Sequence, residues 1–175
     1  MSLIIPGFNA SDFVKFSSCS ASGEIDQTHN ISKQPCENAI DSIVCDKDNG
    51  FRCPGNCGVT FELEKPETFG KIIIQNGVGS RVKQMKAFKL KVKNEVSENW
   101  QSLTSIKVKN DSKIEITDDY ITLSRGQEYL EIAFKAVKQV TEIKIEIRDS
   151  STKINEILIP RKLISQRQKT SNSNN

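Results

Sequence analysis

The sequence predicts an all-β fold, an antiparallel β-sandwich in which two sheets enclose one core. Two observations carry this prediction. Short segments of alternating apolar and polar residues recur through most of the chain, and such a period of two is typical of strands with one buried and one solvated face. Turn-forming residues separate these segments, and no long amphipathic helix lies between them, as expected for a sandwich of short strands.

The most informative stretch covers residues 59–100. Its first segment, 59–64, alternates and predicts a half-buried strand. After a proline turn, the isoleucine run 71–74 predicts a strand deep in the core. The alternation returns in 88–93, and the stretch ends at Trp100, the only tryptophan of the chain. We expect most other strands to pack against these three.

The same alternation predicts strands on both sides of this stretch. Toward the N-terminus we expect a strand at 13–16, a turn in the serine-rich segment 17–23, and a helical turn at Ala39 and Ile40. Downstream, short alternating segments predict six further strands, at 106–109, 114–116, 121–123, 130–134, 143–148 and 157–159.

Length and composition are those of one soluble domain. The chain has 175 residues, of which 36% are hydrophobic and 27% charged, and a domain of this size buries about 70% of its unfolded surface. No apolar run approaches the roughly 20 residues of a membrane span. The N-terminus lacks the basic start of a secretory signal, and a mature secreted chain whose signal has been removed stays open as the alternative. We expect the domain over 13–160, between a lead-in over 1–12 and a basic, largely disordered tail over 161–175.

The cysteines all lie in the first third of the chain. They are Cys19, Cys36, Cys45, Cys53 and Cys57. An odd number without a signal peptide favours free thiols in a reducing compartment. Zinc bound by the last four is disfavoured, because their spacing differs from the paired spacing of structural zinc sites. A disulfide between Cys53 and Cys57 is a further alternative.

The segment 46–50 is rich in side-chain oxygens and ends in a glycine. Calcium takes six to eight oxygen ligands, which Asp, Asn and backbone carbonyls of a loop supply. Asp46 and Asp48 are therefore candidate calcium ligands, although the segment lacks the final acid of an EF-hand loop. A polar turn without a metal explains the same composition, and both interpretations stay open.

The second part of the chain is basic and carries a regular series of lysines. From residue 61 onward there are 21 Lys or Arg against 15 Asp or Glu. If the strands that carry the series pair, one solvent face would present five bases. Such a face suits an acidic partner, for example an acidic protein, a tubulin tail or a nucleic acid, and an ordinary solvated face is the alternative. The five are Lys89, Lys91, Lys93, Lys107 and Lys109.

Several landmarks follow one another in a characteristic order. They are a serine pair (Ser17–Ser18), an Asn-Ala-Ile-Asp turn (Asn38–Asp41), a strand–proline–strand unit (Val59–Ile74), a strand and loop leading to a tryptophan (Phe88–Trp100), and a closing Glu-Ile strand (Asn155–Ile157). This order resembles the discoidin, or coagulation factor V/VIII C-type, superfamily of galactose-binding-like jelly rolls. The resemblance implies that the sandwich is such a jelly roll.

The resemblance also implies a branch of the superfamily and a metal site. Secreted members usually join their ends by a disulfide, whereas no cysteine follows Cys57 here. The chain therefore resembles the intracellular branch, which includes the N-terminal domain of a single-strand-break repair scaffold and the jelly-roll subunit of the intraflagellar-transport complex. In many members a calcium ion pins the first loop to the last strand. The resemblance places that structural ion on Asp41, Asp46 or Asp48, together with Glu156.

Function is predicted to be non-catalytic. The chain has one histidine, no glycine-rich phosphate loop and no recognisable Ser/His/Asp or Cys/His set. The leading hypothesis is a protein–protein adaptor or scaffold subunit in a multi-subunit cytoplasmic assembly, with a ciliary or microtubule-associated assembly as one candidate.

Two other classes of partner remain as alternatives. A glycan- or lipid-headgroup-binding module would use loops at one end of the sandwich, where Phe51 with Arg52 beside it is the main aromatic available for stacking. A core position is the other interpretation of Phe51. Nucleic-acid binding ranks third, since the sequence pI of about 8.6 is below the range typical of such domains.

Overall fold

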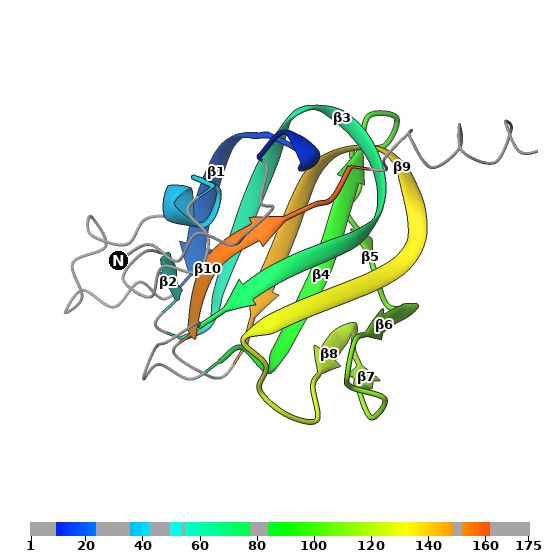
Figure 1. The fold of residues 1–175 in the computed structure, drawn as a ribbon. Coiled ribbons are helices and arrows are strands. Elements are labelled where there is room, and N and C mark those ends of the chain that lie inside the picture. The colour runs from blue at the N-terminus through cyan, green and yellow to red at the C-terminus, as the bar shows by residue number, and fades with distance from the viewer. Residues whose placement is uncertain are drawn as a thin grey trace, which may run out of the picture.

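Two long strands form the centre of the fold. The computed structural model describes residues 10–23, 36–42, 50–53, 55–77, 84–148 and 152–161. Within them, β3 (Cys57–Asn76) and β9 (Tyr129–Ile147) pair antiparallel along most of their length. Both strands bend in the middle, so that their halves lie in two layers of a sandwich (Figure 1).

The bend in β3 replaces a turn that the sequence predicts. Pro66 does not end the strand, because it lies on the exposed bend where the register against β9 shifts, and a strand tolerates proline at such an irregularity. Gly70 lets the two bent strands approach each other, since a Cβ atom at this position would lie 2.8 Å from the carbonyl oxygen of Phe134. The predicted pairs of strands within 59–74 and 130–148 are therefore two continuous strands.

Shorter strands complete both layers. The first layer pairs the first half of β3 and the second half of β9 with β1 (Phe16–Gly23), β4 (Ala87–Asn94), β5 (Gln101–Ser102), β8 (Tyr120–Thr122) and β7 (Glu115–Thr117). The second layer pairs the other halves with β10 (Thr152–Leu158), β2 (Phe51–Cys53) and β6 (Ile106–Val108).

Alternating residues fill the space between the layers. On β4, Phe88, Leu90 and Val92 are buried, while the lysines between them lie on the outer face. Ile143 and Ile145 on the neighbouring β9 are buried in the same way. The all-β sandwich that the alternation predicts is confirmed, and the arrangement is that of a galactose-binding-like jelly roll.

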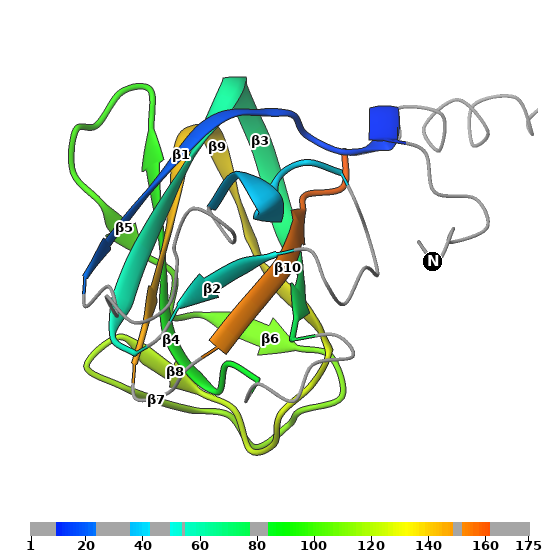
Figure 2. The same ribbon diagram turned by 90° about the vertical axis from the view of Figure 1, so that its left-hand side faces the viewer.

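The two ends of the described chain differ most from the predictions. The serine-rich segment 17–23 lies in β1 rather than in a turn, because pairing with β3 satisfies its backbone. β10 starts earlier than predicted and is buried throughout, next to β2 and the short 3₁₀ helix η3 (Cys36–Ala39) (Figure 2). A second 3₁₀ helix, η1 (Ala10–Asp12), precedes a backbone bridge between Phe13 and Pro160.

Most of the predicted lead-in and tail lie outside the described residues, so the domain boundaries stay predictions. In the described part of the chain, no helix is long and apolar enough to cross a bilayer.

Candidate functional site

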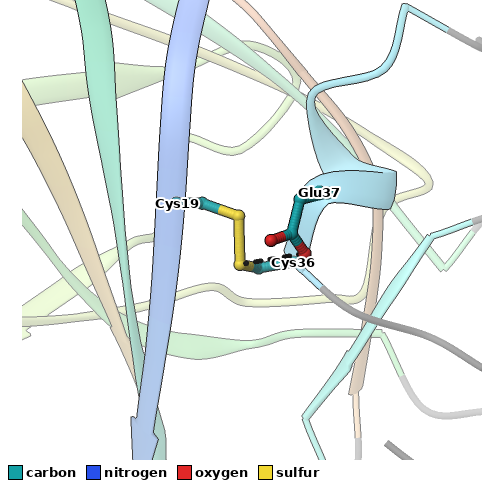
Figure 3. Close-up of side chains that lie close together, drawn as sticks. All are labelled: Cys19, Cys36 and Glu37. Carbon is teal, nitrogen blue, oxygen red and sulfur yellow. Dashed lines mark hydrogen bonds between the residues drawn. A yellow bond between two sulfur atoms is a disulfide. The ribbon is translucent and has the colours of Figure 1, made fainter. Parts of the chain in front are cut away.

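Four of the five cysteines form disulfides, so the prediction of free thiols is wrong for them. Cys19 on β1 is joined to Cys36 at the start of η3 (Figure 3), and Cys53 at the end of β2 is joined to Cys57 at the start of β3. Sequence spacing indicated only the second pair, because the first forms between segments that the fold alone brings together. Cys45 lies outside the described residues.

Glu37 completes a cluster of potential metal ligands beside the first disulfide. Its carboxylate lies 3.7 Å from Cys36 Sγ, and the ligand atoms of Cys19, Cys36 and Glu37 all lie within 4.8 Å of one another (Figure 3). Zinc binds thiolates, and these two sulfurs are bonded to each other instead. The cluster is therefore a cross-link between β1 and η3 and not a zinc site in the oxidised protein.

Glu156 is the most unusual ionisable group in the described structure. It lies on β10 with 2% of its surface exposed. The backbone N–H of Ser42 donates to its Oε1 at 3.2 Å, whereas its buried Oε2 has no hydrogen-bond partner among the described residues. Burial, together with the negative charge of the neighbouring Asp41, raises the pKa of Glu156 to about 9.

These features fit a cation. Asp41 follows η3 and Glu156 lies on the last strand, so the fold brings together two predicted ligands from distant parts of the chain. A buried carboxylate beside another one needs a proton or a cation to offset its charge. Ser42 and Glu156 also line a cleft of about 200 Å³. Asp46 and Asp48, the other predicted ligands, lie outside the described residues.

The five lysines do not share one face, and this part of the prediction is wrong. β4 and β6 do not pair with each other. Both pair with the edge of β9 opposite β3, but along different halves of that strand. Lys89, Lys91 and Lys93 therefore lie on the outer face of the first layer. Lys107 and Lys109 lie on the second layer, opposite Ala133 and Glu131 of β9.

On the first layer, ion pairs link β4 to β9. Lys91 Nζ lies 3.0 Å from Glu146 Oε1, and Lys93 Nζ lies 3.1 Å from Glu142 Oε2. A third pair joins Lys144 Nζ to Glu146 Oε1 at 3.5 Å. Partial burial acts to raise the pKa of Glu146, but the ammonium groups of Lys91 and Lys144 outweigh it and hold the pKa below its usual range.

The second layer has a separate cluster around Glu131. Lys71 Nζ lies 2.6 Å from Glu131 Oε1, and Lys109 Nζ lies 3.4 Å from Oε2. The hydrogen bond from Lys71 is the main reason why the pKa of Glu131 is lowered. Lysines on the two faces of the molecule are thus paired with different carboxylates of β9.

Two aromatic rings on the first layer carry cations. Lys93 Nζ lies 4.6 Å and Lys144 Nζ 5.8 Å from the centroid of the Trp100 ring. Around the Tyr120 ring the corresponding groups are Lys89 Nζ at 4.6 Å and Arg148 Cζ at 4.3 Å from the centroid. Sequence reasoning missed Lys144, Arg148 and Tyr120 as parts of this surface. The alternation in 143–148 places both cations on one face, but it does not reveal that the face adjoins β4.

Phe51 is not available for stacking. It lies in β2 with 4% of its surface exposed and belongs to the core, so its prediction as a sugar-binding aromatic is wrong. Arg52 alternates with it, lies opposite Lys153 of β10 and is half-buried. Its buried Nε has no hydrogen-bond partner among the described residues.

Comparison with known proteins places the fold more firmly than the sequence does. No protein-family model matches the chain, and no curated protein matches it. Among solved structures, an F5/8 type C domain from Bacteroides fragilis has a TM-score of 0.60 at 15% identity, covering 88% of this chain and 99% of its own. A pectin-binding carbohydrate-binding module has a TM-score of 0.57 at 20% identity, covering 86% and 94%.

A third neighbour is a family 32 carbohydrate-binding module of Clostridium perfringens NanJ, solved with galactose. Its TM-score is 0.58 at 12% identity, with 86% of this chain and 95% of that one covered. Identities this low establish the fold alone. The shared fold is the jelly roll that the order of sequence landmarks implies, and it does not single out the intracellular branch.

Proposed function

We propose that the chain is a non-catalytic glycan-binding module. The observation that carries this proposal is the extent of the structural likeness, which spans nearly the whole of several carbohydrate-binding modules. One of these is described as binding pectin, one was solved with galactose, and another with GalNAc-β-1,3-galactose. Glycan binding, an alternative at the level of sequence, thereby replaces the adaptor hypothesis as the leading function.

The disulfides support this change of hypothesis. Cys19–Cys36 and Cys53–Cys57 are bonded in the structure, and disulfides persist in oxidising environments and are rare in the cytosol. An extracellular or luminal location therefore agrees better with the disulfides than the cytoplasmic location that the cysteine count favours or the ciliary one that the family resemblance suggests. Detection of both disulfides by non-reducing mass spectrometry of protein from its native cell would support this location, and free thiols there would contradict it.

We also propose a structural calcium site at Asp41 and Glu156. Bound calcium would supply positive charge between these carboxylates and so tie the end of η3 to β10. Glu156 would contribute Oε2, which has no hydrogen-bond partner in the described part of the chain, and Asp41 would contribute its carboxylate from the exposed side. Asp46 and Asp48 stay candidates for the remaining ligands.

A glycan array tests the proposed function. The oxidised protein in calcium is applied to neutral, acidic and amino-sugar glycans, with binding expected to one class of glycan. A reduced and alkylated sample controls for adhesion of unfolded protein. Absence of binding to every glycan, together with a stoichiometric protein partner from native cells, would return the adaptor hypothesis to first place.

A further inference from the structure

We propose that the outer face of β4 and the second half of β9 binds a polyanionic glycan, a chain whose sugars carry repeated carboxylate or sulfate groups. This inference rests on the proposed function and names both the face and the class of glycan. The surface in question is called the basic strip. It comprises Lys89, Lys91, Lys93, Lys144 and Arg148, with the rings of Trp100 and Tyr120.

The charge of the basic strip is the first argument. Its five cations face two carboxylates on the same strands, Glu142 and Glu146, and both carboxylates already lie against lysines. Among the described residues, Lys89 has no carboxylate partner. Further acidic side chains lie on the neighbouring strands, as Glu62 on β3 and Glu115 on β7. An anionic group would therefore be held along β4 and repelled close to Glu62 and Glu115.

The second argument is that the aromatic rings hold the cations in place. The ammonium groups of Lys93 and Lys144 lie over the ring of Trp100. The ammonium group of Lys89 and the guanidinium of Arg148 lie over the ring of Tyr120. A cation over a ring face is attracted by the ring, so these long side chains lose less freedom when they bind an anion. A merely solvated lysine face has no need of such restraint.

The spacing of the two ring clusters explains why the ligand should be a polymer. Lys89 and Lys93 lie four residues apart on one strand, so the two clusters are separated by about 13 Å. Lys91, between them, faces the same side. One monosaccharide reaches only one cluster, whereas a chain with an anionic group on successive sugars contacts both.

Toward β1 the face is rich in small polar groups. Opposite Lys144 across the sheet lie Thr60 of β3 and then Ser20 of β1, and Gly58 and Ser22 occupy the next row. Hydroxyl groups of this kind donate to and accept from sugar hydroxyls. This margin gives a glycan chain more to contact than an acidic peptide would use.

Affinity electrophoresis or calorimetry with polygalacturonate, in low salt, tests the inference. Fully methyl-esterified polygalacturonate is the neutral control, heparin is the sulfated probe, monomeric galacturonate is the length control, and polyglutamate represents an acidic protein. We expect binding to at least one anionic glycan, loss of that binding at high salt, and no binding of the ester or the monomer.

Matched variants locate the binding face. Replacing Lys89, Lys91 and Lys93 by Gln should weaken binding by about tenfold. Replacing Lys71, Lys107 and Lys109 by Gln removes the same charge from the second layer and should leave binding unchanged. Circular dichroism and thermal melts check that both variants fold. If the first variant does not fold, K89Q with R148Q at the Tyr120 cluster replaces it, with the same expected direction.

Three results would overturn the inference. Equal weakening by both triple variants would mean that only total charge matters, and polyglutamate binding as tight as that of the anionic glycans would mean an acidic protein partner. Tighter binding of a neutral glycan, unaffected by either variant, would remove the basic strip from function while leaving the glycan-binding proposal intact. Failure to bind any glycan would instead contradict the proposed function itself.

Discussion

Glu146 and Glu156 lie in similar strand sequences, each followed by a buried isoleucine, yet their surroundings are opposite. Glu146 is on the outer face of the first layer, where two lysines lower its pKa. Glu156 is on β10, where burial and Asp41 raise its pKa to about 9. The difference lies in what covers the outer side of each strand: solvent and lysines over β9, but η3 and neighbouring elements over β10.

This contrast separates two uses of charge within one sandwich. On the outer face of the first layer, charges neutralise one another in part and leave cations available to a ligand. At the η3–β10 corner, a carboxylate is enclosed and needs a proton or a metal ion. Binding and stability should therefore be sensitive to different substitutions.

The substitution with the largest expected effect removes the disulfide between β1 and η3. Replacing Cys19 and Cys36 by Ser opens a loop with a sequence separation of 17 and should lower the free energy of unfolding by about 3 kcal/mol. Urea denaturation measures this loss. Replacing Cys53 and Cys57, whose separation is 4, should cost less because the loop is shorter. If both replacements lower the free energy of unfolding equally, or if the first has no effect, the disulfide between β1 and η3 is not a main source of stability.

Calcium should stabilise the same corner. At a free concentration of 100 times its dissociation constant, an ion that binds only the folded state adds about 2.7 kcal/mol. Thermal melts in calcium and in chelator measure this difference. Glu156→Gln should abolish it, and Glu146→Gln should retain it. Identical melting temperatures in both buffers for the unsubstituted protein would exclude the proposed site.

In chelator, the buried carboxyl should make stability depend on pH. The folded protein holds a proton on Glu156 up to a pKa of about 9, whereas the unfolded chain releases it near the ordinary value of 4.5. The free energy of unfolding should therefore fall as pH rises between these values, by at most about 1.4 kcal/mol per pH unit. Denaturation across this window checks the slope.

Glu146 provides the opposite control for that experiment. Its lowered pKa means that its contribution is present above the ordinary pKa and is lost as pH falls through the folded one. Glu156→Gln should remove most of the fall in stability between pH 4.5 and about 9. Glu146→Gln should change the stability only at lower pH, where Glu146 takes up its proton. If the free energy of unfolding of Glu156→Gln falls with pH as steeply as that of the unsubstituted protein, another group causes the effect.

The smallest effect is expected on the ion pairs of the outer face. Lys91→Ala should cost only about 0.2–1 kcal/mol of stability, less at high salt, because these side chains are partly exposed. It should also move the pKa of Glu146 upward, as followed by NMR titration. A loss comparable to that of the Cys19 and Cys36 variant would show that the outer face is structural.

The sequence predicts the interior of this molecule better than its topology. Alternation on β4 identifies Phe88, Leu90 and Val92 as core residues, since a period of two leaves little choice. It does not predict that Pro66 lies inside one continuous strand. Proline has no backbone N–H to donate, and the strand continues through it because the register against β9 shifts at this bend. Nor does it reveal that β10 is buried on both faces, which depends on η3 packing from elsewhere in the chain.

The candidate sites follow the same division. The order of the family-like landmarks predicts Asp41 and Glu156 as ligands of one site, because the family resemblance implies a contact between distant parts of the chain. Local sequence patterns contain no such information. The alternation correctly places the lysines of each strand on one face. The prediction that β4 and β6 share that face is wrong, because the fold decides which strands pair. Lys144 and the disulfide between Cys19 and Cys36 needed the tertiary structure for the same reason.

The most direct test of the whole account is NMR chemical-shift mapping with an oligogalacturonate, carried out on the oxidised protein in calcium. If the account is correct, amide signals of residues 89–93 and 142–148 shift with increasing ligand, while those of Lys71, Lys107 and Lys109 do not. Shifts centred on the second layer, or none with this or any other anionic glycan, would contradict it.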